Sequence, residues 1–181
     1  MDHASLALLI DALSFAAQQH RNQRRRDPDA SPYINHPIDL IRVLSVEGGV
    51  HDPQILCAAL LHDVLEDCAT EPQELLERFG AEICNLVMEV SDDTALPKVE
   101  RRRQQVLRAR SASQGARLIK LADKICNIRQ MPVNWDDSRS QSYFDFAAEV
   151  ITQVRGTHMG LESLFDQAFA NRSAGGEFNE R

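Results

Sequence analysis

The chain lacks an apolar run long enough to cross a membrane. None of its 181 residues belongs to a stretch near the roughly 18 consecutive apolar residues that a membrane span needs. An acid, Asp2, stands where a signal peptide carries positive charge, and the apolar side chains that follow recur at helical spacing. We therefore expect a cytoplasmic protein. Its length suffices for one domain with a core.

Paired cysteines and an excess of positive charge are also missing. Cys57, Cys68, Cys84 and Cys126 form no C-x-x-C pair, and each lies in or beside an apolar helical run. This favours buried, reduced thiols over disulfides or a zinc site. The formal net charge of −7 disfavours general nucleic-acid binding, although arginines cluster at residues 21–26 and 101–103.

Regular alternation of apolar and polar residues is absent, so the sequence predicts helices rather than strands. Helices are expected at residues 5–21, 37–47, 53–67, 72–79, 81–91, 98–110, 114–131, 137–154 and 160–170. We expect one all-α bundle over residues 1–171, with about eight to ten helices and at most a short hairpin. Residues 172–181 carry few apolar side chains and are predicted to be a disordered tail.

The end of the predicted central helix carries four polar residues. His62, Asp63, Glu66 and Asp67 fall within a sector of about 140° of a continuous helix. Burial would desolvate these acids, Asp63 and Asp67 repel each other, and the helix end is already negative. A divalent cation with His62 as a nitrogen ligand would relieve all three problems. A frayed, solvated end whose acids meet surface lysines or arginines explains the residues equally well.

Two further polar residues lie where the apolar pattern predicts burial. His36 is expected to cap the second helix, with Pro37 at its first position, and Asp123 lies within a good core helix. Alone, His36 could be only a cap, and Asp123 could pair with Lys120 or Arg129. With the His-Asp step they form two imidazoles and two carboxylates, a set that suits manganese or iron. The absence of a thiolate argues against structural zinc.

The order of a lone His, an adjacent His-Asp and a distant Asp resembles the metal signature of HD domains. Five longer segments are more specific: RRRDPDASPYINHP, AALLHDVLED, FGAEICNLVMEVSDD, LPKVERRR and KLADKICNIR. Together they resemble the hydrolase domain of the RelA/SpoT family, especially its small stand-alone members, which include the metazoan SpoT homologues. The resemblance runs from the first predicted helix to beyond Tyr143.

This resemblance implies a site and a reaction. It implies that His36, His62, Asp63 and Asp123 bind one manganese ion, and that Glu66 and Asp67 position and deprotonate the attacking water. The implied activity removes the 3′-pyrophosphate of (p)ppGpp, giving GDP or GTP and pyrophosphate. The nucleotide would contact Arg25, Arg26, Lys98, Asn127, Arg129, Arg139 and Tyr143. Side-chain cations would have to meet the charge that builds on the released pyrophosphate group, since one metal cannot hold both the attacking and leaving oxygens.

Two alternatives stay open at this point. One is an NADPH 2′-phosphatase or a broader nucleotide phosphohydrolase, because a ribose 2′- or 3′-phosphate offers similar geometry. The other is a non-catalytic HD module that binds a nucleotide. Thr94-Ala95 and residues 130–133 depart from the family pattern near the expected base pocket. We expect a small nucleotide as partner, with no nucleic acid and no membrane, and we leave a homo-oligomer open. Trp135 and Phe144 are expected to be packing residues, and His20 a surface or structural one.

Overall fold

Two central helices, α3 (Pro53–Leu61) and α8 (Gln114–Arg129), organise the fold of the computed structural model, which describes residues 2–171. Every residue from Leu56 to Leu61 is buried, and α8 buries most of its length. A helix that is apolar on all sides must be covered on all sides. Accordingly, α3 packs against α1, α2 and α6, and α8 packs against α2, α6, α9 and α10.

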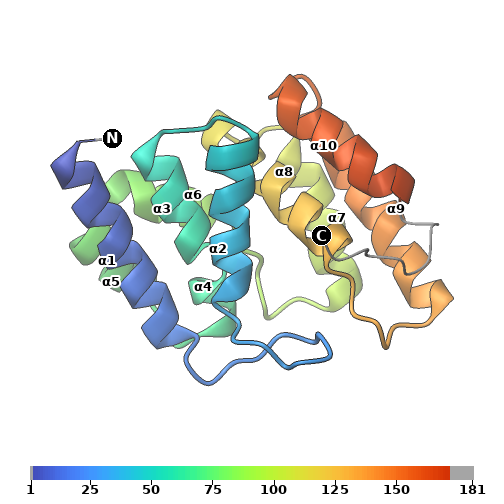
Figure 1. Cartoon of the computed structure of the whole chain (residues 1–181), viewed down its shortest axis with the longest axis horizontal. Helices are drawn as coiled ribbons and strands as arrows, with labels where there is room; N and C mark the ends of the chain where they lie inside the picture. The colour runs from blue at the N-terminus through green and yellow to red at the C-terminus, as the bar shows by residue number, and fades with distance from the viewer. Residues whose placement is uncertain (1, 172–181) are drawn as a thin grey trace, which may run out of the picture.

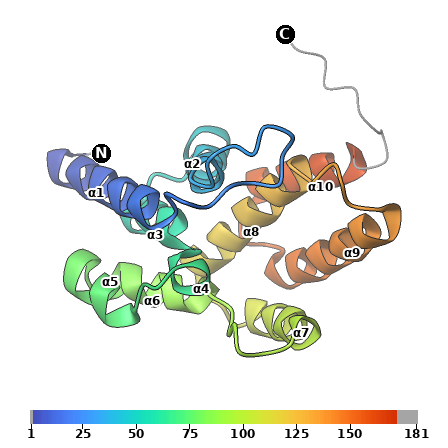
Figure 2. The same cartoon turned by 90° about the horizontal axis from the view of Figure 1, so that it is seen from below.

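The remaining helices surround this pair, as Figures 1 and 2 show. They are α1 (His3–Gln19), α2 (Asn35–Arg42), α4 (Val64–Asp67), α5 (Pro72–Phe79), α6 (Ala81–Val90), α7 (Lys98–Ala109), α9 (Asp137–Val154) and α10 (Met159–Ala170). The predicted all-α class is confirmed: within residues 2–171, β structure is limited to an isolated bridge between Arg24 and Pro32. In the same residues, no helix has both the length and the hydropathy of a membrane span. The predicted tail, residues 172–181, lies outside the described part of the chain.

Helix starts and stops agree with the sequence signals in several places. The Asp52 carboxylate accepts hydrogen bonds from the backbone N–H groups of Gln54 and Ile55, and Pro53 is the first residue of α3. The expectation that His36 caps the second helix is wrong, because α2 begins at Asn35 and its N-cap is Ile34. The His36 side chain, only 3% exposed, is therefore free to face the interior. The same helix ends in a π-helical turn, η1 (Val43–Glu47), which the sequence pattern did not predict.

The predicted central helix is also not continuous. It stops at Leu61, residues 62 and 63 form a turn, and α4 begins at Val64. His62 Nδ1 lies 2.8 Å from the carbonyl oxygen of Ala59, the acceptor that the N–H of Asp63 would use in a continuous α-helix. The imidazole thus replaces a backbone donor. The break separates His62 and Asp63 from the Glu66-Asp67 pair that follows.

Candidate active site

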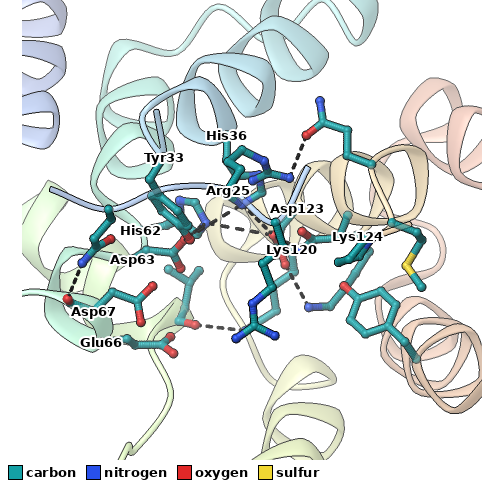
Figure 3. Close-up of a pocket in the computed structure, with 18 of the residues that line it drawn as sticks. Arg25, Tyr33, His36, His62, Asp63, Glu66, Asp67, Lys120, Asp123 and Lys124 are labelled. Atoms are coloured by element: carbon teal, nitrogen blue, oxygen red, sulfur yellow. Dashed lines mark hydrogen bonds and ion pairs between the residues drawn. The ribbon is translucent and has the colours of Figure 1, made fainter. Parts of the chain in front are cut away.

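Three side chains from separate elements bring ligand atoms together at the centre of the bundle. His36 comes from the start of α2, His62 from the end of α3 and Asp123 from α8. Their ligand atoms all lie within 4.8 Å of one another, and His36 Nε2 is 3.4 Å from Asp123 Oδ1. Figure 3 shows the three side chains meeting at one point. Such a buried nitrogen and oxygen cluster could hold one metal ion.

Asp63, the fourth predicted ligand, lies beside this cluster. Its Oδ2 atom is 3.0 Å from His62 Nε2 and 3.9 Å from His36 Nε2. The hydroxyl of Tyr33 donates a 2.5 Å hydrogen bond to the same oxygen. Burial and the charge of Asp63 raise the pKa of Tyr33, so the phenol keeps its proton and can hold this carboxylate in place. The structure thus brings together all four residues of the predicted ligand set.

The protonation of His62 tests whether these residues fit a metal. Its Nδ1 donates to the carbonyl of Ala59, which leaves Nε2 directed toward the two carboxylates, where it can carry a proton or bind a metal. Within residues 2–171 this buried Nε2 atom has no hydrogen-bond partner of suitable geometry, although Asp63 Oδ2 lies 3.0 Å away. A buried ring nitrogen that faces two carboxylates is suited to a cation between them. The donor set therefore fits a divalent metal ion.

Electrostatics lead to the same conclusion. Burial disfavours a charged imidazole, but Asp63 and Asp123 outweigh it and raise the pKa of His62 to about 9. Burial likewise opposes the charge on Asp123, yet Lys124 and the two imidazoles keep the pKa of this carboxyl well below its ordinary value. The site thus holds two anions, each less than one-fifth exposed, that require positive charge. A metal and a proton would compete for the same nitrogen.

Glu66 and Asp67 extend from α4 into the same cavity. Glu66 Oε1 accepts a 2.8 Å hydrogen bond from the backbone N–H of Asp92. Burial outweighs this bond and, with the charge of Asp63, raises the pKa of Glu66 to about 7. Burial and Asp63 also raise the pKa of Asp67. A carboxylate with a pKa near neutrality can accept a proton from a weak acid such as bound water.

The cavity that holds these groups has a volume of about 610 Å³. Four residues of the predicted nucleotide set line it: Arg25, Arg26, Asn127 and Tyr143. Arg25 extends from the loop after α1 and donates a hydrogen bond to the side chain of Gln130, just beyond α8 (Figure 3). Asn127 donates to Asp123 Oδ1 at 2.6 Å. The space is large enough for a nucleotide and carries positive charge at its rim.

Comparison with known proteins agrees with this geometry. A family model described as an HD domain matches residues 12–154. The chain belongs to the HD-domain family. Mouse guanosine-3′,5′-bis(diphosphate) 3′-pyrophosphohydrolase MESH1 is 48% identical over 170 residues, which cover 92% of this chain and 95% of the relative. The Drosophila melanogaster protein of the same name is 44% identical over the same shares.

A solved structure and a longer relative give further comparisons for this HD-domain protein. The structure, described as a metazoan ortholog of SpoT that hydrolyzes ppGpp, has a TM-score of 0.88 and 43% identity, and covers 92% of this chain and 96% of its own. The GTP pyrophosphokinase rsh of Brucella melitensis is 35% identical over 140 residues, which cover 74% of this chain but 18% of that protein. The family resemblance seen in the sequence is confirmed.

Three residues of the predicted nucleotide set lie outside the residues that line the cavity of this HD-domain protein. The guanidinium of Arg129 is 3.0 Å from both carboxylate oxygens of Glu47. That of Arg139 lies over Trp135, 4.3 Å from the ring centroid. Lys98 is exposed on α7, and slight burial with the charges of neighbouring arginines lowers its pKa. Their contacts with a nucleotide stay predictions.

Several cavity residues of the HD-domain protein were not predicted. Tyr33, Gln105, Lys120 and Lys124 line the cavity, as does Trp135, which was expected to be a packing residue. His20, expected to be at the surface or structural, is buried, and its ring lies 4.7 Å from that of Tyr33. The two lysines did carry a signal. They flank Asp123 on a helix whose apolar spacing predicts burial, and a lysine is rarely buried there unless it is paired.

Proposed function

We propose that this HD-domain protein is a metal-dependent guanosine 3′,5′-bis(diphosphate) 3′-pyrophosphohydrolase, which degrades (p)ppGpp to GDP or GTP and pyrophosphate. Mouse and fruit-fly relatives that match most of the chain carry this name. The observation that carries the proposal is the meeting of four ligand residues, the Glu66-Asp67 pair and two arginines in one cavity. We further propose that the metal is manganese and that residues 1–171 form the catalytic domain.

In this reaction, Glu66 accepts a proton from the attacking water, with Asp67 beside it on α4 to orient that water. The water oxygen bonds to the phosphorus attached to the ribose 3′ oxygen, and the bond between this phosphorus and the 3′ oxygen breaks. The 3′ oxygen takes a proton to become the hydroxyl of GDP, and the pyrophosphate carries the oxygen of the water. A divalent ion, when bound, supplies Lewis acidity that makes water a stronger acid near neutral pH.

Side chains around the ligand residues hold them in place. Tyr33 fixes Asp63 through its hydroxyl, and the carbonyl of Ala59 fixes the ring of His62. Lys124 donates to Asp123 Oδ2 at 2.8 Å, while Asn127 bonds the other oxygen. Such supporting hydrogen bonds orient ligands and tune their basicity. Arg25 and Arg26 would bind phosphate oxygens at the mouth of the cavity, where a guanidinium can make two parallel hydrogen bonds.

Product analysis tests the proposal directly. The purified protein is incubated with ppGpp and, separately, with NADPH, each with manganese and each with a chelator in place of the metal. We expect GDP and pyrophosphate from ppGpp, only in the presence of the metal. Free phosphate from NADPH alone would favour the 2′-phosphatase alternative, and binding of ppGpp without product would favour the non-catalytic module. Equal turnover with chelator would contradict metal dependence.

A further inference from the structure

Lys120 places a buried ammonium group in the wall of the catalytic cavity. It lies on α8, is 6% exposed and lines the cavity. Its Nζ donates one long hydrogen bond, 3.3 Å, to the carbonyl of Val90 at the end of α6. Among residues 2–171, no carboxylate forms an ion pair with Lys120 within 4.0 Å. Most of its capacity to donate hydrogen bonds to protein groups is therefore unused, although the side chain is only 6% exposed.

The neighbouring Lys124 differs in this respect. It is equally buried, yet its Nζ pairs with Asp123 at 2.8 Å and lies over the ring of Phe146. Burial and the charge of Lys124 lower the pKa of Lys120 to about 8, which indicates an ammonium that lacks a close anion. A buried cation of this kind is costly to keep unless a ligand completes its environment.

The position of Lys120 indicates which ligand this is. It precedes Asp123 by three residues, so the two side chains leave the same face of α8. Figure 3 shows Lys120 beside Asp123, and Glu66 reaches the same cavity from α4. Glu66 does not form an ion pair with Lys120 within 4.0 Å, and its Oε1 instead accepts a hydrogen bond from the backbone N–H of Asp92. A phosphoryl group placed between Asp123 and Glu66 would come within reach of Lys120.

We infer that Lys120 is a further catalytic residue, whose ammonium contacts a non-bridging oxygen of the phosphoryl group that water attacks. The inference rests on the proposed hydrolysis. Negative charge shifts among the phosphoryl oxygens as the bond to the 3′ oxygen breaks, and one metal ion touches only part of it. Lys120 supplies a buried positive charge in the cavity wall, whereas Lys124 is already paired with Asp123. Arg25 and Arg26 are more exposed.

A purely structural role for Lys120 is the competing explanation, since a lysine can stabilise the carbonyl at the end of a helix. The chain offers a matched control on the same helix. Arg117 lies one turn before Lys120, and its guanidinium donates a 2.7 Å hydrogen bond to the carbonyl of Arg110, at the end of α7. It does not line the cavity. Both residues thus join α8 to the end of another helix, and only Lys120 faces the substrate.

The test compares wild type, Lys120→Met, Lys120→Gln, Lys120→Arg and Arg117→Met. Wild-type hydrolysis of ppGpp is measured first, because its absence would refute the proposed function rather than the role of Lys120. We then expect Lys120→Met and Lys120→Gln to lower kcat about 100-fold or more with bound metal unchanged, as removal of a transition-state donor does. Lys120→Arg should recover part of kcat, and Arg117→Met should keep the wild-type value.

Inhibition by inorganic pyrophosphate gives a second measurement, which should not change if Lys120 has only a structural role. At one fixed metal concentration, so that chelation affects all proteins alike, the half-inhibitory concentration should rise about tenfold in Lys120→Met. It should not change in Arg117→Met. Melting temperatures identify variants that fold poorly, and kinetics are then measured well below them. The inference would be overturned if Lys120→Met and Lys120→Gln both kept the wild-type kcat and the wild-type inhibition by pyrophosphate. It would also be overturned if Arg117→Met lost as much kcat as these two variants.

Discussion

Glu66 and Asp67 differ from Asp63 and Asp123, because within residues 2–171 neither of them forms an ion pair with a side-chain cation. The hydrogen bond that Glu66 accepts comes from a backbone N–H, and its pKa is raised to about 7, while Asp63 and Asp123 have lowered values. The cavity carboxylates therefore have two different roles. The carboxylates with lowered pKa keep their charge for a cation, whereas Glu66, whose pKa lies near neutrality, can exchange a proton. The pKa of Asp67, beside it, is also raised.

Replacing Glu66 with glutamine should separate binding from turnover. Glutamine keeps an oxygen for the N–H of Asp92 but cannot take a proton, so we expect kcat to fall by about 10²–10⁴-fold. Bound metal and the dissociation constant for ppGpp should stay near the wild-type values. Rapid-quench kinetics and titration calorimetry provide these measurements. Glu74→Gln, at an exposed position of α5, is the matched control. Hydrolysis at the wild-type rate in Glu66→Gln would remove this residue from the mechanism.

The raised pKa of Glu66 also predicts how the rate depends on pH. Below its pKa the carboxyl is protonated and cannot accept a proton, so kcat/KM should rise with pH and level off above about 7. A bound divalent ion favours the ionised form of Glu66 and therefore moves the rise of kcat/KM to lower pH. Metal content is measured at each pH, since protonation of His62 also displaces a metal. A rate that stays flat from about pH 5 to 8 with full metal occupancy would contradict this assignment.

Residue identity and order were enough to predict the ligand set, because His36, the His62-Asp63 step and Asp123 match a family pattern. Chain order does not reveal which other side chains converge on them. Tyr33 reaches Asp63 across 30 residues of sequence, and Arg25 reaches Gln130 across 105. Lys120 was considered only as a surface partner for Asp123, whereas it is buried in the cavity wall. Contacts of this kind depend on helix packing, which periodicity alone does not specify.

At the scale of helices, the predictions failed where a side chain or an extra residue interrupts the backbone pattern. The imidazole of His62 takes the carbonyl of Ala59, so the helix ends before Asp63. In η1, the N–H of Gly48 bonds the carbonyl of Val43, five residues back, which widens the last turn. Both interruptions preserve the apolar spacing around them, so the sequence pattern could not show them. The first lies directly at the site and positions His62.

Gly48 shows why the wide turn needs a residue without a side chain. A Cβ there would lie 2.8 Å from the carbonyl oxygen of Leu44 and 2.7 Å from Leu161 on α10. Because the backbone oxygen cannot move freely, we expect Gly48→Ala to lower the free energy of unfolding by about 1–3 kcal/mol. Urea denaturation measures this change. Val46→Ala, whose side chain in the same turn is 73% exposed, should stay within about 0.5 kcal/mol. An equal effect of both variants would contradict the close contact.

For the whole molecule, the site joins parts of the bundle that are distant in sequence. One ligand residue comes from α2, two from the α3–α4 junction and one from α8, the helix that also packs against α9 and α10. Without a metal, the carboxylates of Asp63 and Asp123 depend for positive charge on Lys124 and on a proton at His62. A cation bound at this point would therefore act on the stability of the entire fold, since the unfolded chain has no comparable site.

This coupling predicts that manganese raises the melting temperature. A metal that binds only the folded state adds about 2.7 kcal/mol at a concentration one hundred times its dissociation constant. We expect wild type and Glu66→Gln to gain stability on titration with manganese and to lose it with a chelator, as differential scanning calorimetry would measure. Asp123→Asn removes a ligand charge and keeps a similar shape, so this variant should gain little stability and should not hydrolyse ppGpp. Equal gains in wild type and Asp123→Asn would mean that the ion binds elsewhere, because Asp123 is the link between the cation and the central helix α8.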